Sequence, residues 1–191
     1  AMLHGFTGAD LDIVVGRGAG LSDEGLKLKK DVISKAIEPH KPNSSDPIDV
    51  LSKVGGFDIA AMAGTYIACA ARRIPAVMDG FISGVAAILA YRLCPEVKNY
   101  IFPSHGSVEP GTKIMMDDLG REPLMYMNLR LGEGTGAALG ERGGLTPGEE
   151  VAQAASPKHG PRFLSLPGIW EAPAVSDGKV ALATAAHPDD V

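Results

Sequence analysis

Short apolar runs alternate with helix-length segments along the first 140 residues, and this alternation restricts the fold more than any single motif does. Apolar strands separated by helices are typical of a parallel sheet that is covered by helices on both faces. We therefore expect an α/β protein with a Rossmann-like, three-layer arrangement. The expected strands lie at residues 12–15, 75–78, 100–102 and 123–127.

Helix signals occupy the segments between these strands. Ser22 is a favourable N-cap residue, and the acidic Asp23 and Glu24 that follow it suit the first turn of a helix. Asp46 followed by Pro47 predicts a second helix start, because proline is tolerated at the first helical position. The expected helices cover residues 22–38, 47–54, 57–73, 82–93 and 110–120, and a further helix begins near residue 137.

The two ends of the chain look less regular. Residues 1–11 are expected to form an entry loop. Residues 141–191 are rich in glycine, proline, alanine and charged residues and show no sustained period, so we predict a low-order, irregular tail there. The α/β domain is accordingly expected to span residues 1–140.

Composition excludes several classes of protein. The net charge is −5 and no basic stretch is interleaved with aromatic residues, so nucleic acid is not an expected partner. Cys69 and Cys94 belong to no Cys-x-x-Cys motif, which argues against a disulfide framework or a zinc site and favours a reducing, cytoplasmic location. The longest apolar run, at residues 59–71, is too short to span a bilayer.

A glycine-rich or polar cluster follows each predicted strand. In open α/β sheets, ligands bind outside the carboxyl ends of the strands, so the clusters predict one shared site. Glu133 lies between Gly132 and Gly134. It is either a carboxylate that faces a ligand or a solvated residue at a sharp turn, and Lys29 likewise has the alternative of a solvated lysine. The clusters are Gly16–Gly20, Asp79-Gly80, Ser104–Glu109 and Gly132–Gly136.

A series of motifs over residues 12–139 resembles the nicotinate-nucleotide:dimethylbenzimidazole phosphoribosyltransferase family. Only the second half of the family's enzyme is represented, and Ala19 stands where the family usually has threonine. The motifs are Gly16-Arg-Gly-x-Gly20 with Gly25-Leu26 and Lys29, then Val54-Gly-Gly56, Asp79-Gly-Phe81, Ser104-His105-x-Ser107-x-Glu109 and Leu129-Arg-Leu-Gly-Glu-Gly-Thr-Gly-Ala-Ala138.

The resemblance implies transfer of a phosphoribosyl group from nicotinate mononucleotide to 5,6-dimethylbenzimidazole or a related azole base, without a metal or cofactor. Glu133 matches the family's general base, a role that suits a carboxylate beside an apolar ring. Asp79 either orients the ribose or Arg130 or caps the next helix, and His105 either contacts the substrate or braces its loop. The remaining substrate-binding positions implied are Lys29, Ser107, Leu131, Gly132, Gly16, Gly18 and Gly20.

Glu109 precedes Pro110 and is expected to cap the helix that follows, or else to belong to the site. Two alternatives to an active enzyme remain at this point. The chain is either a non-catalytic half that binds the nucleotide, or a subunit that docks on a separate N-terminal half. An exposed sheet edge favours self-association, so a homodimer is also expected.

Overall fold

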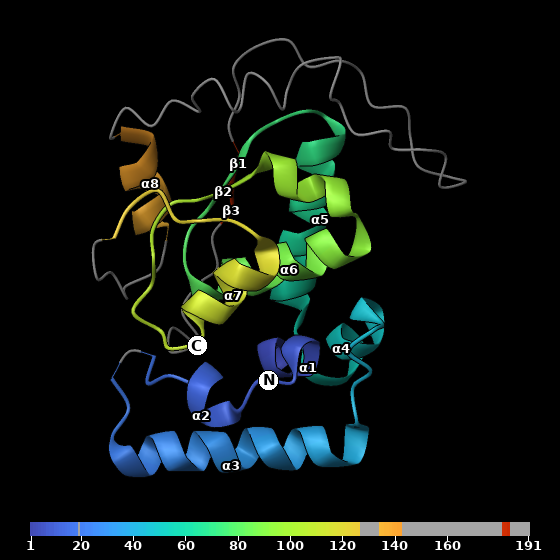
Figure 1. Cartoon of the computed structure of the whole chain (residues 1–191), viewed down its shortest axis with the longest axis vertical. Helices are drawn as coiled ribbons and strands as arrows, with labels where there is room; N and C mark the ends of the chain where they lie inside the picture. The colour runs from blue at the N-terminus through green and yellow to red at the C-terminus, as the bar shows by residue number, and fades with distance from the viewer. Residues whose placement is uncertain (19, 127–133, 143–180, 184–191) are drawn as a thin grey trace.

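The chain folds as an α/β protein in which a small parallel sheet is accompanied by many helices, as the computed structural model shows (Figure 1). The sequence-based prediction of an α/β protein with parallel strands is thus confirmed. The structure describes residues 1–18, 20–126, 134–142 and 181–183.

Within the described residues the sheet has three parallel strands in the order β2-β1-β3. The central strand β1 pairs through Ala76 with Ile101 on one side and with Ala181 on the other. The predicted strands at 75–78 and 100–102 are therefore confirmed. The strands are β1 (Ala76–Met78), β2 (Ile101–Pro103) and β3 (Ala181–Ala183).

Strand β3 lies inside the segment that the sequence predicts to be an irregular tail, so the prediction does not hold for these three residues. A central strand of a parallel sheet needs a hydrogen-bonding neighbour on each edge. β3 supplies that neighbour for β1, and a pairing between segments so far apart in the chain has no local sequence signal.

The start of the chain differs from the prediction. Residues predicted as a loop contain α1 (Met2–Thr7), which buries Met2, Leu3 and Phe6, and the predicted strand at 12–15 is instead α2 (Leu11–Val14). The side chain of Asp10 accepts a hydrogen bond from the backbone N–H of Asp12 and so caps α2. Capping and burial of the helix thus override the β propensity of the branched residues here.

The predicted strand at 123–127 is present only as a single parallel bridge between His105 and Met125, and residue 127 lies outside the described residues. Backbone hydrogen bonds from Leu124 to Pro103 and from Gly106 to Met125 hold this segment beside the end of β2. It therefore runs alongside the sheet without becoming a full strand.

The remaining predicted helices are confirmed, with ends that differ by a few residues. Ser22 and Asp46 cap the helices that they were expected to cap, through hydrogen bonds to backbone N–H groups of the first turn. The helices are α3 (Asp23–His40), α4 (Pro47–Val54), α5 (Phe57–Ala71), α6 (Phe81–Leu93), α7 (Thr112–Leu119) and α8 (Thr135–Arg142), with a 3-10 helix η1 (Pro95–Tyr100) before β2.

The core is centred on α6, which is buried from Ser83 to Ala90 and packs against α5 and α7. Figure 1 shows α5 and α6 on one side of the strands and α8 on the other, while α3 lies at the far end of the molecule beyond α1, α2 and α4. No residue of α3 is fully buried. None of the helices in the described part of the chain is both long and apolar enough to cross a membrane.

Candidate functional site

The residue that follows β1, Asp79, connects the central strand to the first turn of α8. Its side chain is almost fully buried, with 2% of its surface exposed. One carboxylate oxygen, Oδ2, accepts the backbone N–H of Gly134 at 3.1 Å, and the other, Oδ1, accepts that of Ala137 at 3.0 Å. A carboxylate at a helix N-terminus satisfies free N–H groups and is favoured by the helix dipole. Asp79 therefore fixes the start of α8 at the carboxyl end of β1.

The loop after β2 adds two buried polar side chains beside Asp79. The hydroxyl of Ser104 donates to the carbonyl oxygen of Asp79 at 3.1 Å and lies 3.0 Å from Nδ1 of His105. Because the single hydroxyl proton is used on the carbonyl, the second bond requires that Nδ1 of His105 carries the proton. This leaves Nε2 of His105 as a hydrogen-bond acceptor.

Burial sets the protonation of His105. Removal of the ring from water lowers the pKa of His105 below its ordinary value of 6.5, and the nearby negative charge of Asp79 opposes this shift without reversing it. The imidazole is thus neutral at physiological pH, in agreement with a ring that donates from one nitrogen and accepts at the other.

Helix α8 packs directly on this pair of residues. A Cβ atom added to Gly136 would lie 2.0 Å from Nδ1 of His105 and 3.0 Å from Oδ1 of Asp79. Position 136 therefore has no room for a side chain. We call Asp79, Ser104, His105 and Gly136 the β1 cluster.

A second group of residues, the glycine-loop cluster, consists of Gly16, Gly18, Lys29, Ser107 and Glu109. The ammonium group of Lys29 donates to the carbonyl oxygen of Gly16 at 3.1 Å. Oε1 of Glu109 accepts the backbone N–H of Gly18 at 3.0 Å, and the backbone N–H of Glu109 donates to Oγ of Ser107 at 3.3 Å. Residues 104–109 run from the β1 cluster to the glycine-loop cluster, so one loop connects the two.

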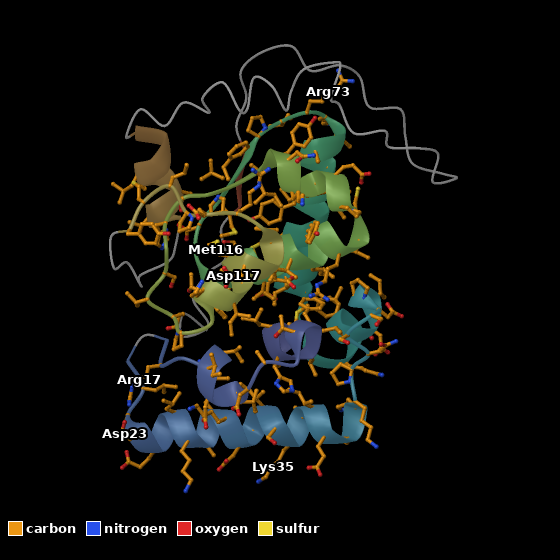
Figure 2. The ribbon with its side chains drawn as sticks, viewed as in Figure 1. Arg17, Asp23, Lys35, Arg73, Met116 and Asp117 are labelled. Atoms are coloured by element: carbon orange, nitrogen blue, oxygen red, sulfur yellow. The ribbon has the colours of Figure 1, made fainter. Side chains whose placement is uncertain are left out.

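The glycine loop also has a side chain on its outer surface. Figure 2 shows Arg17 beside Asp23 at one end of α3, where the two form an exposed ion pair. This pair holds the pKa of Asp23 below its ordinary range through a hydrogen bond from Arg17. A second nitrogen of Arg17 donates to the carbonyl oxygen of Leu21, so Arg17 fastens the loop to the start of α3.

The structure brings together many of the sequence-predicted site residues in these two clusters. The cap of the next helix, α6, that was one alternative for Asp79 is not observed, because its carboxylate accepts N–H groups at the start of α8. The ring of His105 bonds to the hydroxyl of Ser104, its neighbour in the same loop. Gly20 is exposed and closes a turn with Arg17. Glu133, Leu131, Gly132 and Arg130 lie outside the described residues.

Of the two alternatives stated for Glu109, a cap of the following helix or a place in the site, the cap is not observed. The side chain of Glu109 reaches across to Gly18, and only its backbone carbonyl accepts the N–H of Thr112. The sequence feature that indicated a place for Glu109 near the site was its membership of the polar cluster that follows the strand predicted at 100–102. Within the described ranges, no group of three or more histidine, cysteine or acidic side chains could hold a metal ion.

Comparisons with known proteins show which family the chain resembles. A family model described as Phosphoribosyltransferase matches residues 1–141. The chain is 59% identical over 133 residues to the nicotinate-nucleotide–dimethylbenzimidazole phosphoribosyltransferase of Acetivibrio thermocellus, covering 70% of this chain and 38% of that protein. The enzyme of the same name from Dehalococcoides mccartyi is 53% identical over 133 residues, with the same coverage of 70% and 38%.

The chain is also similar to a solved structure. The crystal structure of CobT from Thermus thermophilus matches 81% of this chain and 44% of its own length, with a TM-score of 0.70 and 34% identity. The chain thus spans about 38% of the length of the curated relatives that it matches, and the matched part lies in their C-terminal half.

Proposed function

The chain belongs to the nicotinate-nucleotide–dimethylbenzimidazole phosphoribosyltransferase family, as its motifs predict, and from this premise we propose that it takes part in phosphoribosyl transfer from nicotinate mononucleotide to 5,6-dimethylbenzimidazole or a related azole. The product would be α-ribazole 5′-phosphate, the nucleotide used in the assembly of cobalamin. The observation that supports this most directly is the pair of hydrogen bonds that the carboxylate of Asp79 accepts from Gly134 and Ala137, immediately after Glu133 in the chain.

The proposed reaction needs a base that removes a proton from the azole. The azole nitrogen forms a bond to C1′ of the ribose while the bond from C1′ to the nicotinate nitrogen breaks, and the electron pair of that bond neutralises the pyridinium. The azole ring must then lose a proton, and we assign the role of the base that accepts it to the carboxylate of Glu133. Asp79 holds the N–H of Gly134, the next residue, and would thereby position Glu133.

The glycine-loop cluster supports a site for the 5′-phosphate. Lys29 uses one of its three N–H donors on Gly16, and the hydroxyl of Ser107 accepts from Glu109. Among the described residues, the other donors of Lys29 and the proton of Ser107 have no partner and would be available to an anion. Lysine as a point charge and serine as a donor suit a phosphate group. Backbone N–H groups around Gly132 would complete the phosphate site, with Leu131 beside it.

The second candidate function is a nucleotide-binding part that needs the remainder of the enzyme for turnover. It is favoured because the chain spans about 38% of the length of its relatives, so that a partner would supply the remainder of the enzyme. A second copy of the chain or an N-terminal half would be that partner.

Several further features belong to this proposal. Residues 1–140 would form the phosphoribosyltransferase domain, with three layers in the complete enzyme. The tail predicted for residues 141–191 lies outside the described residues, except for residues 141–142 and 181–183. The enzyme would act in the cytoplasm, without nucleic acid as a partner.

Binding and turnover measured on the same sample test the proposal. Calorimetry should detect nicotinate mononucleotide bound to the full chain, and chromatography should detect ribazole phosphate once the N-terminal part of a relative is added. Glu133→Gln should keep binding and lose turnover by about 10²–10⁴-fold, because the amide cannot accept a proton. The exposed Glu122→Gln is the matched control. Normal turnover of the Glu133 variant would exclude that residue as the base.

A further inference from the structure

We infer that Glu109 is a positioning residue that holds the phosphate-binding groups of the site in place. The inference rests on the proposed function and extends it to a side chain that the family motifs include but to which the resemblance assigns no role. Oε1 of Glu109 accepts the backbone N–H of Gly18 at 3.0 Å, between residues that are 91 positions apart in the chain. This bond joins the glycine loop before α3 to the loop after β2.

The fit between Glu109 and the glycine loop is close. A Cβ atom added to Gly16 would lie 1.7 Å from Oε2 of Glu109 and 2.7 Å from Cδ of Pro110. The absence of a side chain at position 16 is therefore what lets the carboxylate approach the loop. Real Cβ atoms do not come so near to other heavy atoms, so this contact depends on glycine.

Two groups assigned to the phosphate, Lys29 and Ser107, connect through this contact. Lys29 donates to the carbonyl oxygen of Gly16, which is the residue that Glu109 packs against. Ser107 accepts the backbone N–H of Glu109 itself. The carboxylate of Glu109 therefore sets the distance between the strand-end loop that carries Ser107 and the glycine loop that Lys29 braces.

The contact with Glu109 occupies a backbone N–H of the glycine loop that was expected to bind the substrate. The N–H of Gly18 is used on Glu109, so the loop is held by a carboxylate of the protein at this position and the phosphate is left to Lys29 and Ser107. Groups held in their binding positions before the ligand arrives lose less entropy on binding. Glu109 thus acts on the phosphate through other residues.

A hydrogen-bonding role and a charge role make different predictions for two substitutions. Glutamine keeps a side-chain oxygen that accepts from Gly18 and removes the charge, whereas alanine removes both. If Glu109 positions the loop through its hydrogen bond, Glu109→Gln retains nucleotide affinity and Glu109→Ala loses it. The exposed Glu122→Ala serves as the matched control.

The test measures binding of nicotinate mononucleotide and of nicotinate riboside, which lacks the phosphate, to the full chain by calorimetry. Glu109→Ala should weaken mononucleotide binding by roughly tenfold or more, as for a lost hydrogen bond to a charged group, and leave the riboside nearly unchanged. Glu109→Gln should bind both as the unaltered chain does. Thermal melts of each variant establish that the fold is retained.

The outcomes separate the inference from the proposed function. If the unaltered chain binds no mononucleotide, alone or with the N-terminal part of a relative, the proposed function fails. If it binds and Glu109→Ala binds equally well, the proposed function stands and the positioning role is excluded. Equal losses for mononucleotide and riboside, or a glutamine variant as weak as the alanine variant, also overturn the positioning role.

Discussion

Asp79 and Gly134, 55 positions apart in the chain, are joined by a buried hydrogen bond of 3.1 Å from the backbone N–H of Gly134 to Oδ2 of Asp79. The bond connects the carboxyl end of β1 to the glycine-rich stretch that carries Glu133. Because the other oxygen of the same carboxylate holds Ala137, the first turn of α8 cannot move without losing both bonds.

Asp79→Asn should lower the free energy of unfolding by about 1–3 kcal/mol, the usual cost of leaving a buried polar group without its partner. The amide keeps one acceptor and places an NH₂ group against the second backbone N–H. Urea or thermal unfolding measures the change. Asp117→Asn is the control, because Asp117 lies on α7 in an exposed ion pair with Lys113, worth at most about 1 kcal/mol (Figure 2). Equal losses in the two variants would contradict the anchoring role.

Two glycine substitutions should have opposite signs. Gly136→Ala places a methyl group 2.0 Å from Nδ1 of His105 and should destabilise the fold by about 1–3 kcal/mol. Gly64→Ala adds a methyl group where nothing lies within 4 Å, inside α5, and should stabilise by about 0.5–1 kcal/mol through helix propensity. Denaturant midpoints compare them, and an unchanged midpoint for Gly136→Ala would mean that α8 does not pack on His105.

Stability should fall as the pH drops below 6.5, because of His105. Burial holds the pKa of His105 below its ordinary value of 6.5 in the folded chain, so unfolding takes up a proton in the interval between the two values. The free energy of unfolding therefore decreases as the pH falls through that interval. Above the interval, the contribution of the neutral His105 ring to stability is complete. His105→Asn should flatten this part of the profile when melts are compared between about pH 5 and 8. A profile of unchanged slope would show that another group causes the loss.

Lys29→Ala should weaken binding of nicotinate mononucleotide and leave binding of the free azole base intact. The loss of a hydrogen bond to a charged group is worth about 1.5–3 kcal/mol. Lys35→Ala is the matched control, since Lys35 is exposed on the same helix and points away from the rest of the molecule (Figure 2). Calorimetry at low salt compares the variants, and unchanged nucleotide affinity would make Lys29 a brace for Gly16 only.

The sequence alone predicted the features that depend on nearby residues. The helix starts at Ser22 and Asp46 follow from side-chain caps that act within one turn, and strands β1 and β2 follow from short apolar runs between helices. The meeting of Asp79 and His105 was also predictable, because both follow parallel strands that end at the same edge of the sheet.

Only the tertiary structure decided the features that join distant segments. The branched residues Ile13 and Val14 lie in α2 because Asp10 caps the turn and Val14 is buried, and β3 forms because β1 has an edge to pair with. The contact of Glu109 with Gly18 depends on two loops meeting 91 positions apart. Such contacts follow from how the elements pack, since propensities and caps act only over a few neighbouring residues.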